Sequence, residues 1–493
     1  MKKDYKLPSH LDEAKRTKEE VDVEYGLFSM NDQLEALGKG KNYYIRTYGC
    51  QANVRDGESI AGMMEVMGYK NTEKPENADV LIFNTCAVRR AAEEHVLGEI
   101  GMLKGLKTED PNRVFCICGC MAQEESVVQE ILKSYPQVDL IFGTHNIYRL
   151  PDLLKEVITT KQRKVEVLSE EGKVIENLPV KRTQNVKGFV DIMYGCNKFC
   201  TYCIVPYTRG KERSRRMGDI VREVKQLMDN GGKEVILLGQ NVNAYGKDLG
   251  MEDGFTDLLI EIAKLGIERI RFYSSSPRDY SESTIQAMLD YPNIMPALHL
   301  PVQSGSNEVL RRMARGYTVE EYKEVFDRLK AKIPNITFTT DLIVGFPGET
   351  EEEFQETISL VDYCKFDGAF SFAYSPREGT PAARMENQID TDVKKRRLQE
   401  LNEHINHWAK ENNLKYSNKI VKVLCEGRSK KNADVYSGYS EENKLVNFTG
   451  KEGLENQIVE VEITEVRSFS LNGKALWLIL VCFIIVMQKR NQK

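Results

Sequence analysis

The sequence predicts an α/β protein made of a small parallel α/β domain, a partial (β/α)6 barrel and a small C-terminal β-barrel. Two observations predict this fold class. Short apolar runs alternate with helix-like stretches from Tyr43 to about residue 157 and again, over a longer span, from Gly188, as in parallel sheets covered by helices. From Lys419 only short alternating strands remain, separated by glycines and polar turns. A chain of 493 residues is long enough for several such domains.

The composition is that of a globular protein in a reducing compartment. Apolar residues make up 41% of the chain and charged residues 29%, as in soluble globular proteins. Eleven cysteines in 493 residues are too sparse for a small secreted disulfide scaffold. The N-terminus lacks the apolar segment of a secretory signal, so the expected location is the cytoplasm. Because the net charge is −5, any binding of nucleic acid must be local.

The first part of the chain is expected to hold an extension and one domain. Residues 1–40 are charged and weakly periodic, which predicts a flexible or loosely helical extension. Residues 41–157 are expected to form the first α/β domain. Its expected strands are Tyr43–Tyr48, Val80–Phe83, Val114–Ile117 and Val138–Phe142.

Three of these strands are each followed by a turn that carries a cysteine: Cys50, Cys86 and Cys120. Because the carboxyl ends of parallel strands lie along one edge of a sheet, these distant cysteines could converge on one point. Cys116 and Cys118 alternate with Cys120 on one face of the third strand, so spacing alone does not select the ligand. Cys120 is favoured because it lies in the Gly-Cys turn at the strand end, and the other two are expected to be buried core residues.

Residues 182–412 are expected to form the barrel. Its expected strands are Gly188–Tyr194, Glu234–Gly239, Arg269–Ser274, Ala297–Pro301, Ile336–Val344 and Gly368–Ala373. Active sites of such barrels lie at the carboxyl ends of the strands. Those ends carry polar and glycine-rich turns whose amides and side chains could hold a nucleoside; the turns are Gly239–Asn243, Ser274–Pro277, Leu300–Ser306 and Asp341–Glu349.

A CxxxCxxC loop, with Cys196, Cys200 and Cys203, follows the first barrel strand. Three thiolates at this spacing can hold three irons of a [4Fe–4S] cube, which ordinarily takes four cysteines. No fourth cysteine follows before Cys364, so one iron keeps an open position, the feature that makes a metal site reactive. A zinc knuckle would need a fourth Cys or His nearby, and a buried cysteine cluster is the other alternative.

A basic run follows this loop: Arg209, Lys211, Arg213, Arg215 and Arg216. Its position beside the cysteines favours a role in gripping an anionic substrate, with a solvated surface as the alternative. A solvated surface is the favoured interpretation of a second basic run, Lys394–Arg397.

The C-terminal part is expected to be a β-barrel over residues 415–478, followed by a tail over residues 479–493. A small barrel of this type often binds nucleic acid, and a structural appendage is the alternative. Thirteen consecutive apolar residues, Ala475–Met487, precede the basic end. They are fewer than the roughly 17–25 residues that span a bilayer, so no membrane protein is expected. A last barrel strand, a covering segment and a weak anchor all remain open for this stretch.

Read together, the cysteine turns, the CxxxCxxC loop and the terminal barrel resemble the methylthiotransferase family of radical S-adenosylmethionine (SAM) enzymes. These enzymes have an N-terminal auxiliary-cluster domain and a C-terminal TRAM domain, and the resemblance covers about residues 41 to 475. The turns Tyr48–Asn53 and Asn84–Arg89 are most similar to those of the tRNA enzymes that make 2-methylthio-N6-dimethylallyladenosine next to the anticodon. Ala52 departs from the family, which usually has Met there, as do the extension and the apolar tail.

The resemblance implies two [4Fe–4S] clusters and two SAM molecules per turnover, one as radical source and one as methyl donor. By this resemblance Cys196, Cys200 and Cys203 hold the SAM-cleaving cluster, and Cys50, Cys86 and Cys120 hold the auxiliary cluster that bears the sulfur. The SAM-binding edge is implied at Gly239, Gln240, Asn241, Gln303, Ser304, Asp341, Gly345 and Glu349.

The family also implies partners. The TRAM barrel and the basic run from Arg209 to Arg216 would hold a tRNA anticodon stem–loop by its shape and unstacked bases. An electron donor such as flavodoxin or ferredoxin and a sulfur source are expected, together with a monomeric state.

Two other functions stay open. The first is a methylthiotransferase acting on threonylcarbamoyl-adenosine in tRNA or on a ribosomal-protein aspartate. The second is a non-catalytic iron–sulfur RNA-binding protein, which the missing fourth ligand at each cysteine triad disfavours.

Overall fold

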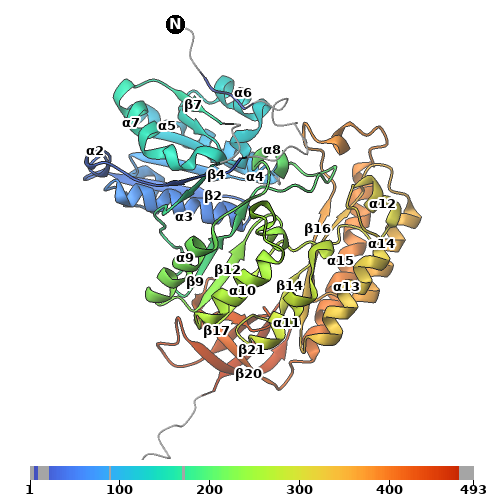
Figure 1. The fold of residues 1–493 in the computed structure, drawn as a ribbon. Coiled ribbons are helices and arrows are strands. Elements are labelled where there is room, and N and C mark those ends of the chain that lie inside the picture. Colours follow the sequence, from blue (N-terminus) through green and yellow to red (C-terminus); the bar gives the residue numbers. More distant parts are fainter. Residues whose placement is uncertain (1–4, 9–21, 88–89, 169–172, 477–493) are drawn as a thin grey trace, which may run out of the picture.

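The computed structural model describes residues 5–8, 22–87, 90–168 and 173–476. It has three parts stacked along one direction (Figure 1): an N-terminal α/β domain, a central half-open barrel, and a C-terminal β-barrel at the far end. The α/β class with these three parts, predicted from the alternation of apolar runs, is confirmed. Among the described residues, no helix is long and apolar enough to cross a membrane.

The N-terminal domain is a six-stranded parallel sheet in the order β3-β2-β4-β5-β6-β7. One face packs on α3 and α7 and the other on α4 and α6. This explains why the central strands β4 and β5 are buried over their whole length and are largely apolar, apart from Asn84 and Thr85 at the end of β4. The strands are β2 (Asn42–Thr47), β3 (Lys70–Asn71), β4 (Val80–Thr85), β5 (Val114–Gly119), β6 (Val138–Phe142) and β7 (Lys164–Glu166), and the helices are α3 (Gln51–Val66), α4 (Arg90–Met102), α5 (Lys104–Glu109), α6 (Glu125–Ser134) and α7 (Leu150–Thr160).

Two segments differ from the sequence prediction. Residues 24–27, expected in a flexible extension, form β1 (Glu24–Leu27), which pairs in parallel with β8 (Lys173–Glu176), and α2 (Asp32–Glu35) follows. The sheet also continues past residue 157, the expected end of this domain, because β7 pairs with β6. Both strands are short and find their partners far away in sequence, so local periodicity could not detect them.

The central part contains six parallel strands in two three-stranded sheets, β9-β12-β13 and β14-β15-β16, joined by a bridge between Ile270 and Ile294. The strands are β9 (Lys187–Asp191), β12 (Glu234–Leu238), β13 (Arg269–Phe272), β14 (Ala297–His299), β15 (Thr337–Val344) and β16 (Gly368–Ala373). The outer layer comprises α9 (Met217–Asp229), α10 (Gly254–Lys264), α11 (Glu282–Asp290), α13 (Val319–Lys332), α14 (Glu351–Cys364) and α15 (Thr391–Leu414).

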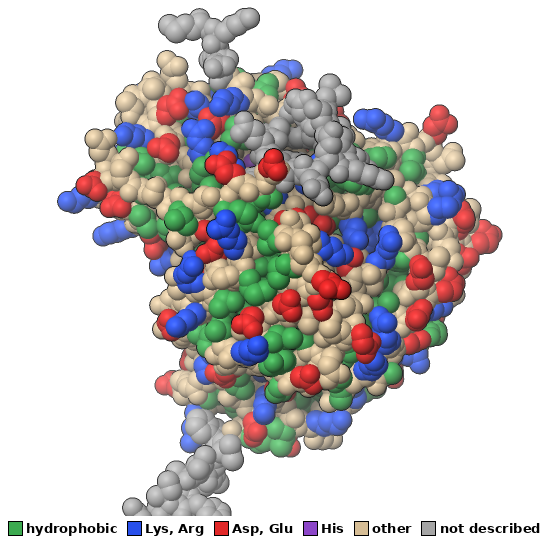
Figure 2. All heavy atoms as spheres, viewed as in Figure 1, with side chains coloured by type: hydrophobic (Ala, Val, Ile, Leu, Met, Phe, Trp, Pro, Cys, Tyr) green, Lys and Arg blue, Asp and Glu red, His purple; other side chains and the backbone are tan. Residues whose placement is uncertain are grey.

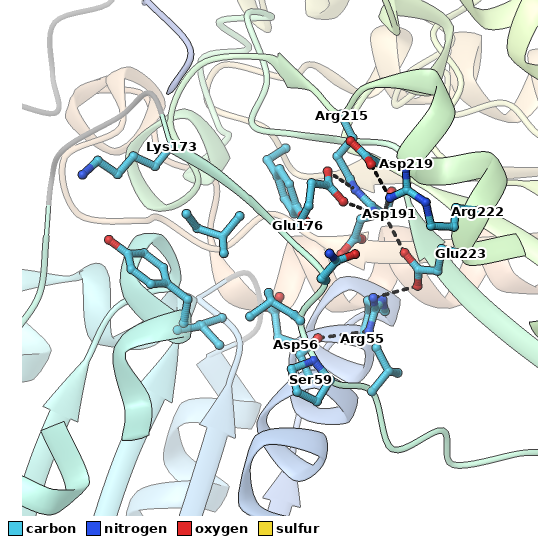
Figure 3. A pocket seen from close by; sticks show the side chains of 18 of the residues that line it. Arg55, Asp56, Ser59, Lys173, Glu176, Asp191, Arg215, Asp219, Arg222 and Glu223 are labelled. Carbon is cyan, nitrogen blue, oxygen red and sulfur yellow. Dashed lines mark hydrogen bonds and ion pairs between the residues drawn. The ribbon is translucent and has the colours of Figure 1, made fainter. Parts of the chain in front are cut away.

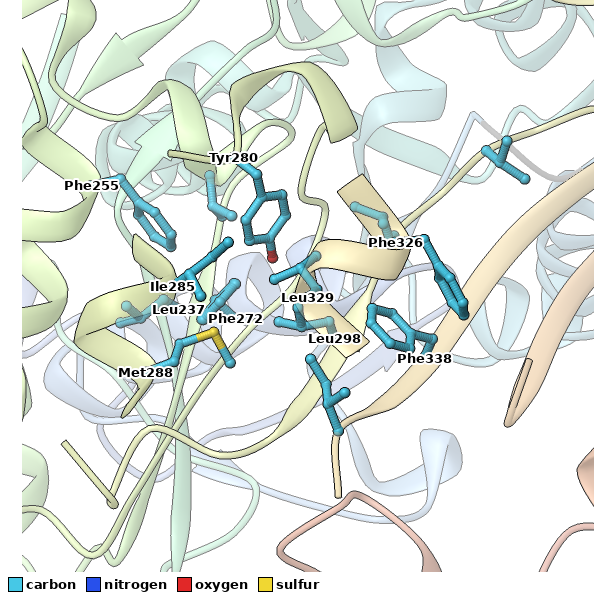
Figure 4. Packing of buried hydrophobic residues seen from close by; sticks show 14 of the residues in the cluster. Leu237, Phe255, Phe272, Tyr280, Ile285, Met288, Leu298, Phe326, Leu329 and Phe338 are labelled. Atoms are coloured by element: carbon cyan, nitrogen blue, oxygen red, sulfur yellow. The ribbon is translucent and has the colours of Figure 1, made fainter. Parts of the chain in front are cut away.

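Aromatic side chains hold the helices to the barrel strands (Figure 4). Phe255 on α10 meets Phe272 on β13 edge to face with ring centroids 5.1 Å apart. Phe326 on α13 lies 4.4 Å from Phe338 on β15 by the same measure. The strands are therefore anchored from outside, and their carboxyl ends are left to carry functional turns.

The C-terminal domain is a closed barrel in the order β17-β18-β19-β21-β20. Its strands are β17 (Ile420–Ser429), β18 (Asn432–Ser440), β19 (Leu445–Thr449), β20 (Ile458–Val466) and β21 (Leu471–Ala475). Strand β21, which was not predicted from the sequence, pairs with β19 and β20 and closes the barrel. The apolar stretch that was considered as a last strand, a cover or an anchor lies, beyond residue 476, outside the described residues.

The C-terminal barrel covers the amino-terminal end of the central strands. Guanidinium groups of Arg269 and Arg271 on β13 donate to the carbonyl oxygens of Tyr439 (2.8 Å) and Ser440 (2.7 Å). Lys444 forms a buried ion pair of 2.8 Å with Asp367, which precedes β16. This barrel is therefore built onto the end of the central domain opposite the carboxyl-end turns.

Candidate active site

The first cysteine triad lies at the carboxyl edge of the N-terminal sheet. Cys50 immediately precedes α3, Cys86 follows β4, and Cys120 begins a 3-10 turn after β5. Because β2, β4 and β5 are neighbouring parallel strands, their ends bring the three cysteines to one edge. A hydrogen bond from the Cys86 thiol is the main cause that lowers the pKa of Cys50 to about 5.

Two glycines allow these turns to approach one another closely. Gly49 has a φ of 135°, and a Cβ there would lie 2.6 Å from the Cβ of Cys86. Gly119 has a φ of 91°, and a Cβ there would lie 2.4 Å from the carbonyl oxygen of Thr85. Only glycine fits both the backbone conformation and the space at these positions.

Cys116 and Cys118 do not take part in this edge. Both are fully buried in the core between the sheet and the helices α3 and α7, beside Tyr43 and Ile60. Burial raises the pKa of each thiol. The prediction that they are core residues is therefore confirmed.

The second cysteine triad lies in the loop after β10 (Met193–Tyr194). Cys196 and Cys200 are buried and Cys203 is half-buried. Backbone hydrogen bonds of 3.0 Å hold the loop, from the Cys196 amide to the Gly210 carbonyl and from the Cys203 amide to the Cys200 carbonyl. Burial raises the pKa of Cys196, so metal binding at this thiol would have to displace its proton.

Two N–H groups point at sulfur atoms of this second triad. The Lys198 amide lies 3.4 Å from the Cys196 Sγ. Nη1 of Arg315, in the turn after α12 (Asn307–Arg312), lies 3.3 Å from the Cys200 Sγ, and its Nη2 donates to the Pro301 carbonyl at 3.0 Å. N–H···S hydrogen bonds favour the thiolate and adjust the potential of a bound cluster. Arg315 could not be identified from the sequence, because no local motif distinguishes it from other arginines.

One short segment connects the two triads. After Cys203 the chain forms α8 (Val205–Thr208), and Ile204 and Tyr207 pack against Ala87 and Cys120 of the N-terminal domain. The Thr144 hydroxyl donates to the Thr208 carbonyl at 2.5 Å. The loop of the second triad thus continues directly onto the edge that carries the first.

The residues expected at the SAM-binding edge lie at the carboxyl ends of three strands. Gly239, Gln240 and Asn241 follow β12; Gln303 and Ser304 follow β14; Asp341 lies within the second half of β15, with Gly345 and Glu349 beyond the end of that strand. Side-chain oxygens of Gln240 and Asn241 are buried without a hydrogen-bond partner among the described residues. Buried polar atoms of this kind are rare in folded proteins, and here they fit an edge that receives a ligand.

Two residues expected at this edge have protein partners. The Ser304 hydroxyl lies 3.2 Å from the Thr357 hydroxyl and accepts from the Ser306 amide. Glu349 accepts from the Gly345 amide at 2.6 Å and pairs with buried Arg397 at 2.8 Å, and burial raises its pKa to about 7. These contacts hold both side chains in place, and the Oε1 atom of Glu349 is buried without a hydrogen-bond partner among the described residues. They also correct the interpretation of Arg397 as a solvated surface residue.

Most of the basic run after the second triad does not lie on an exposed surface. Arg209, Arg213 and Arg215 are buried. The other two members of the run are less buried: Lys211 is half-buried and Arg216 is exposed. The Arg216 guanidinium lies 4.3 Å from the centroid of the Tyr25 ring. On the face drawn in Figure 2, basic and acidic side chains are interspersed.

Those arginines instead line a cavity of about 630 Å³ between the N-terminal domain and the central barrel. Figure 3 shows the side chains of its wall converging from α3, α9 and the linker between the domains. Arg215 binds Glu176 (2.5 Å) and Glu223 (2.7 Å), and Arg55 on α3 binds Glu223 at 2.8 Å. Asp191, at the end of β9, lies among these groups, and burial raises its pKa to about 7. These charges bind the two domains together.

Three parts of the chain match known family models. Residues 42–143 match the uncharacterized protein family UPF0004, residues 190–361 the radical SAM superfamily, and residues 414–476 the TRAM domain. The chain is 52% and 51% identical to the tRNA-2-methylthio-N(6)-dimethylallyladenosine synthases of Bacillus cytotoxicus and Bacillus subtilis, over 95% of this chain and 92% of each relative.

The chain belongs to the tRNA-2-methylthio-N(6)-dimethylallyladenosine synthase family. A solved structure of the radical SAM methyltransferase TsrM from Kitasatospora setae, with tryptophan and a SAM analogue, aligns with a TM-score of 0.52. It is 14% identical and covers 70% of this chain and 75% of that one, so the likeness concerns the fold alone.

Enzymes of this synthase family use SAM and [4Fe–4S] clusters, and both triads fit such clusters. Each presents three sulfur donors, a set typical of iron–sulfur or zinc sites, and the second receives two N–H groups at its sulfurs. Within the described residues, no three His, Cys, Asp or Glu side chains are grouped as they would be around one metal ion. A four-iron cube is larger and holds its thiolates farther apart than a single ion does.

Proposed function

We propose that this chain replaces the C2 hydrogen of N6-dimethylallyladenosine in tRNA with a methylthio group. The observation that carries the proposal is that one chain, 52% identical to synthases with this activity in their name, brings two three-cysteine sites to one interdomain region. When bound, the two clusters and SAM supply the radical, the sulfur and the methyl group that an unreactive aromatic C2–H bond requires.

In this proposal the residues of the chain bind, orient and shield. Cys50, Cys86 and Cys120 are the ligands of the auxiliary cluster, and Cys196, Cys200 and Cys203 are those of the SAM-cleaving cluster. The turn residues Gly239 to Asn241, Gln303 and Asp341 form the SAM-binding edge, and Ser304 and Glu349 hold that edge in shape. Burial of Cys196 and Cys200 keeps water from the second site, which protects radical chemistry from side reactions.

The partners are proposed on broader grounds. TRAM and the family support tRNA as the substrate, and we place the anticodon stem–loop at the interdomain region. A one-electron donor such as flavodoxin or ferredoxin, an external sulfur source, a monomeric enzyme and a cytoplasmic location complete the proposal. We take residues 182–412 as the catalytic domain and 415–478 as the TRAM domain.

The test is an anaerobic reaction of the reconstituted chain with SAM, dithionite and an anticodon stem–loop that carries N6-dimethylallyladenosine. Nucleoside mass spectrometry should show the methylthio product. Cys86→Ala and Cys200→Ala should abolish it, whereas Cys425→Ala, a buried cysteine of the C-terminal barrel, should retain it. SAM cleavage with unmodified RNA would contradict the proposed substrate, and product from a threonylcarbamoyl-adenosine stem–loop would replace it.

A further inference from the structure

Arg209 belongs to the central domain, but its charge lies at the first cysteine triad. It ends α8, with its amide donating to the Val205 carbonyl at 2.8 Å, and only 6% of the residue is exposed. Its Nη2 binds the Oδ2 of Asp56 on α3 at 2.5 Å, and both side chains are buried. Arg209 is therefore fixed across the domain boundary by a charge-assisted hydrogen bond.

The surroundings of Arg209 place its guanidinium against the auxiliary triad. The segment that carries it packs on the Cys120 turn through Ile204 and Tyr207. The guanidinium is within hydrogen-bonding reach of the Cys120 thiol.

Arg315 offers a comparison at the other triad. It lies 3.3 Å from the Cys200 sulfur, but it comes from the same domain as that cysteine. Each triad thus has a guanidinium beside it, and the one at the auxiliary triad is supplied by the neighbouring domain.

We propose that Arg209 is a positioning residue by which the central domain sets the charge, and hence the reduction potential, of the auxiliary cluster. The proposal rests on the assignment of Cys50, Cys86 and Cys120 as ligands of that cluster. A fixed cation next to a cluster stabilises its more negative, reduced state. The Asp56 carboxylate acts in the opposite direction, because it adds negative charge while it holds Arg209 in place. The auxiliary site therefore reaches its working potential only when the two domains are docked.

The experiment uses the full chain with Cys196, Cys200 and Cys203 replaced by Ala, so that only the auxiliary cluster is loaded. Its midpoint potential is measured by electron paramagnetic resonance during an anaerobic redox titration. Arg209→Met should make reduction about tenfold less favourable, a shift of about 59 mV to more negative potential for a one-electron couple. Asp56→Asn, which keeps a hydrogen-bond acceptor, should shift the potential in the positive direction. Arg315→Met is the matched control and should leave it unchanged.

Opposite signs for Arg209→Met and Asp56→Asn would support the inference, because general damage to the fold would not give them. Unchanged potentials in both variants would overturn it while leaving the proposed function intact. If Arg209→Met fails to hold iron, Arg209→Lys decides: iron retained in the Lys variant supports a need for the cation, and equal loss in both overturns it. If the parent auxiliary-only chain binds no four-iron cluster, the ligand assignment and the proposed function fail together with the inference.

Discussion

The two cysteine triads each contain three thiols, but the fold brings those thiols together in different ways. Cys196, Cys200 and Cys203 come from one loop, held by its own backbone hydrogen bonds and by Arg315. Cys50, Cys86 and Cys120 come from three strand ends, and only the register of β2, β4 and β5 brings them together. The first arrangement depends on a local loop and the second on a whole domain. Disturbances of the fold should therefore affect the two sites unequally.

The largest expected effect, and the one that tests whether both triads are needed, comes from removing ligands. Cys203→Ala and Cys120→Ala should each reduce product formation by more than the roughly 10–100-fold that changes around metal ligands typically cause. Cys118→Ala is the matched control and should keep the activity, because Cys118 lies two residues before Cys120, in the core of the N-terminal domain. Product formation and iron content per chain are the measurements. Full activity in Cys120→Ala together with loss of activity in Cys118→Ala would show that Cys118, and not Cys120, is the ligand.

The next change should separate the triads. Gly49→Ala forces a Cβ to within 2.6 Å of the Cys86 Cβ at a φ of 135°, at a cost of about 1–3 kcal/mol in strain. We expect iron content to fall by about half, because the auxiliary cluster is lost and the loop cluster remains.

Gly218→Ala on α9 is the control for this glycine, because nothing lies within 4 Å of the position its Cβ would take. Iron analysis and spectroscopy of the remaining cluster distinguish the outcomes. Equal loss of both clusters in Gly49→Ala would show that the two sites do not fold independently.

A smaller effect should be confined to the loop triad. Arg315→Met removes the N–H donor at 3.3 Å from the Cys200 sulfur, and we expect cleavage of SAM to slow by about 10–100-fold. The rate of 5′-deoxyadenosine formation is the measurement. Arg311→Met, on the exposed side of the same helix end with a surface pair to Glu308, should have no effect. A similar loss in both variants would contradict a specific role for Arg315.

The smallest effect concerns thiol acidity in the metal-free chain. The pKa of Cys50 is lowered to about 5, so this thiol is ionised at pH 7, whereas burial raises the pKa of Cys196 and keeps it protonated. Because the thiolate is the nucleophile, iodoacetamide at pH 7 should label Cys50 before Cys196. Labelling of Cys50 should decline as the pH falls through about 5. Peptide mass spectrometry gives the order, and faster labelling of Cys196 would contradict the contrast.

The difference between the triads also explains what the sequence could predict. The CxxxCxxC loop is visible as a motif, and the strand-end turns of Cys50, Cys86 and Cys120 follow from the alternation of strands and helices. The roles of the arginines are not visible in this way. The partners of Arg209 and Arg215 are carboxylates at positions 56, 176 and 223, and only the folded chain brings these charges together. For the same reason the pairing of β1 with β8 was missed, since each strand is too short to be recognised alone.

The position of the TRAM barrel changes how its removal should be understood. The end of β18 and its connection to β19 cover the amino-terminal end of the central strands, where they contact Arg269, Arg271 and Asp367. Cutting the chain before β17 would remove these partners from Arg269, Arg271 and Asp367 and expose the amino-terminal end of the central strands to solvent. Loss of activity in a truncated protein could therefore result from structural damage to the central domain as readily as from a missing RNA contact. Point changes on the outer face of TRAM are the cleaner way to separate architecture from recognition.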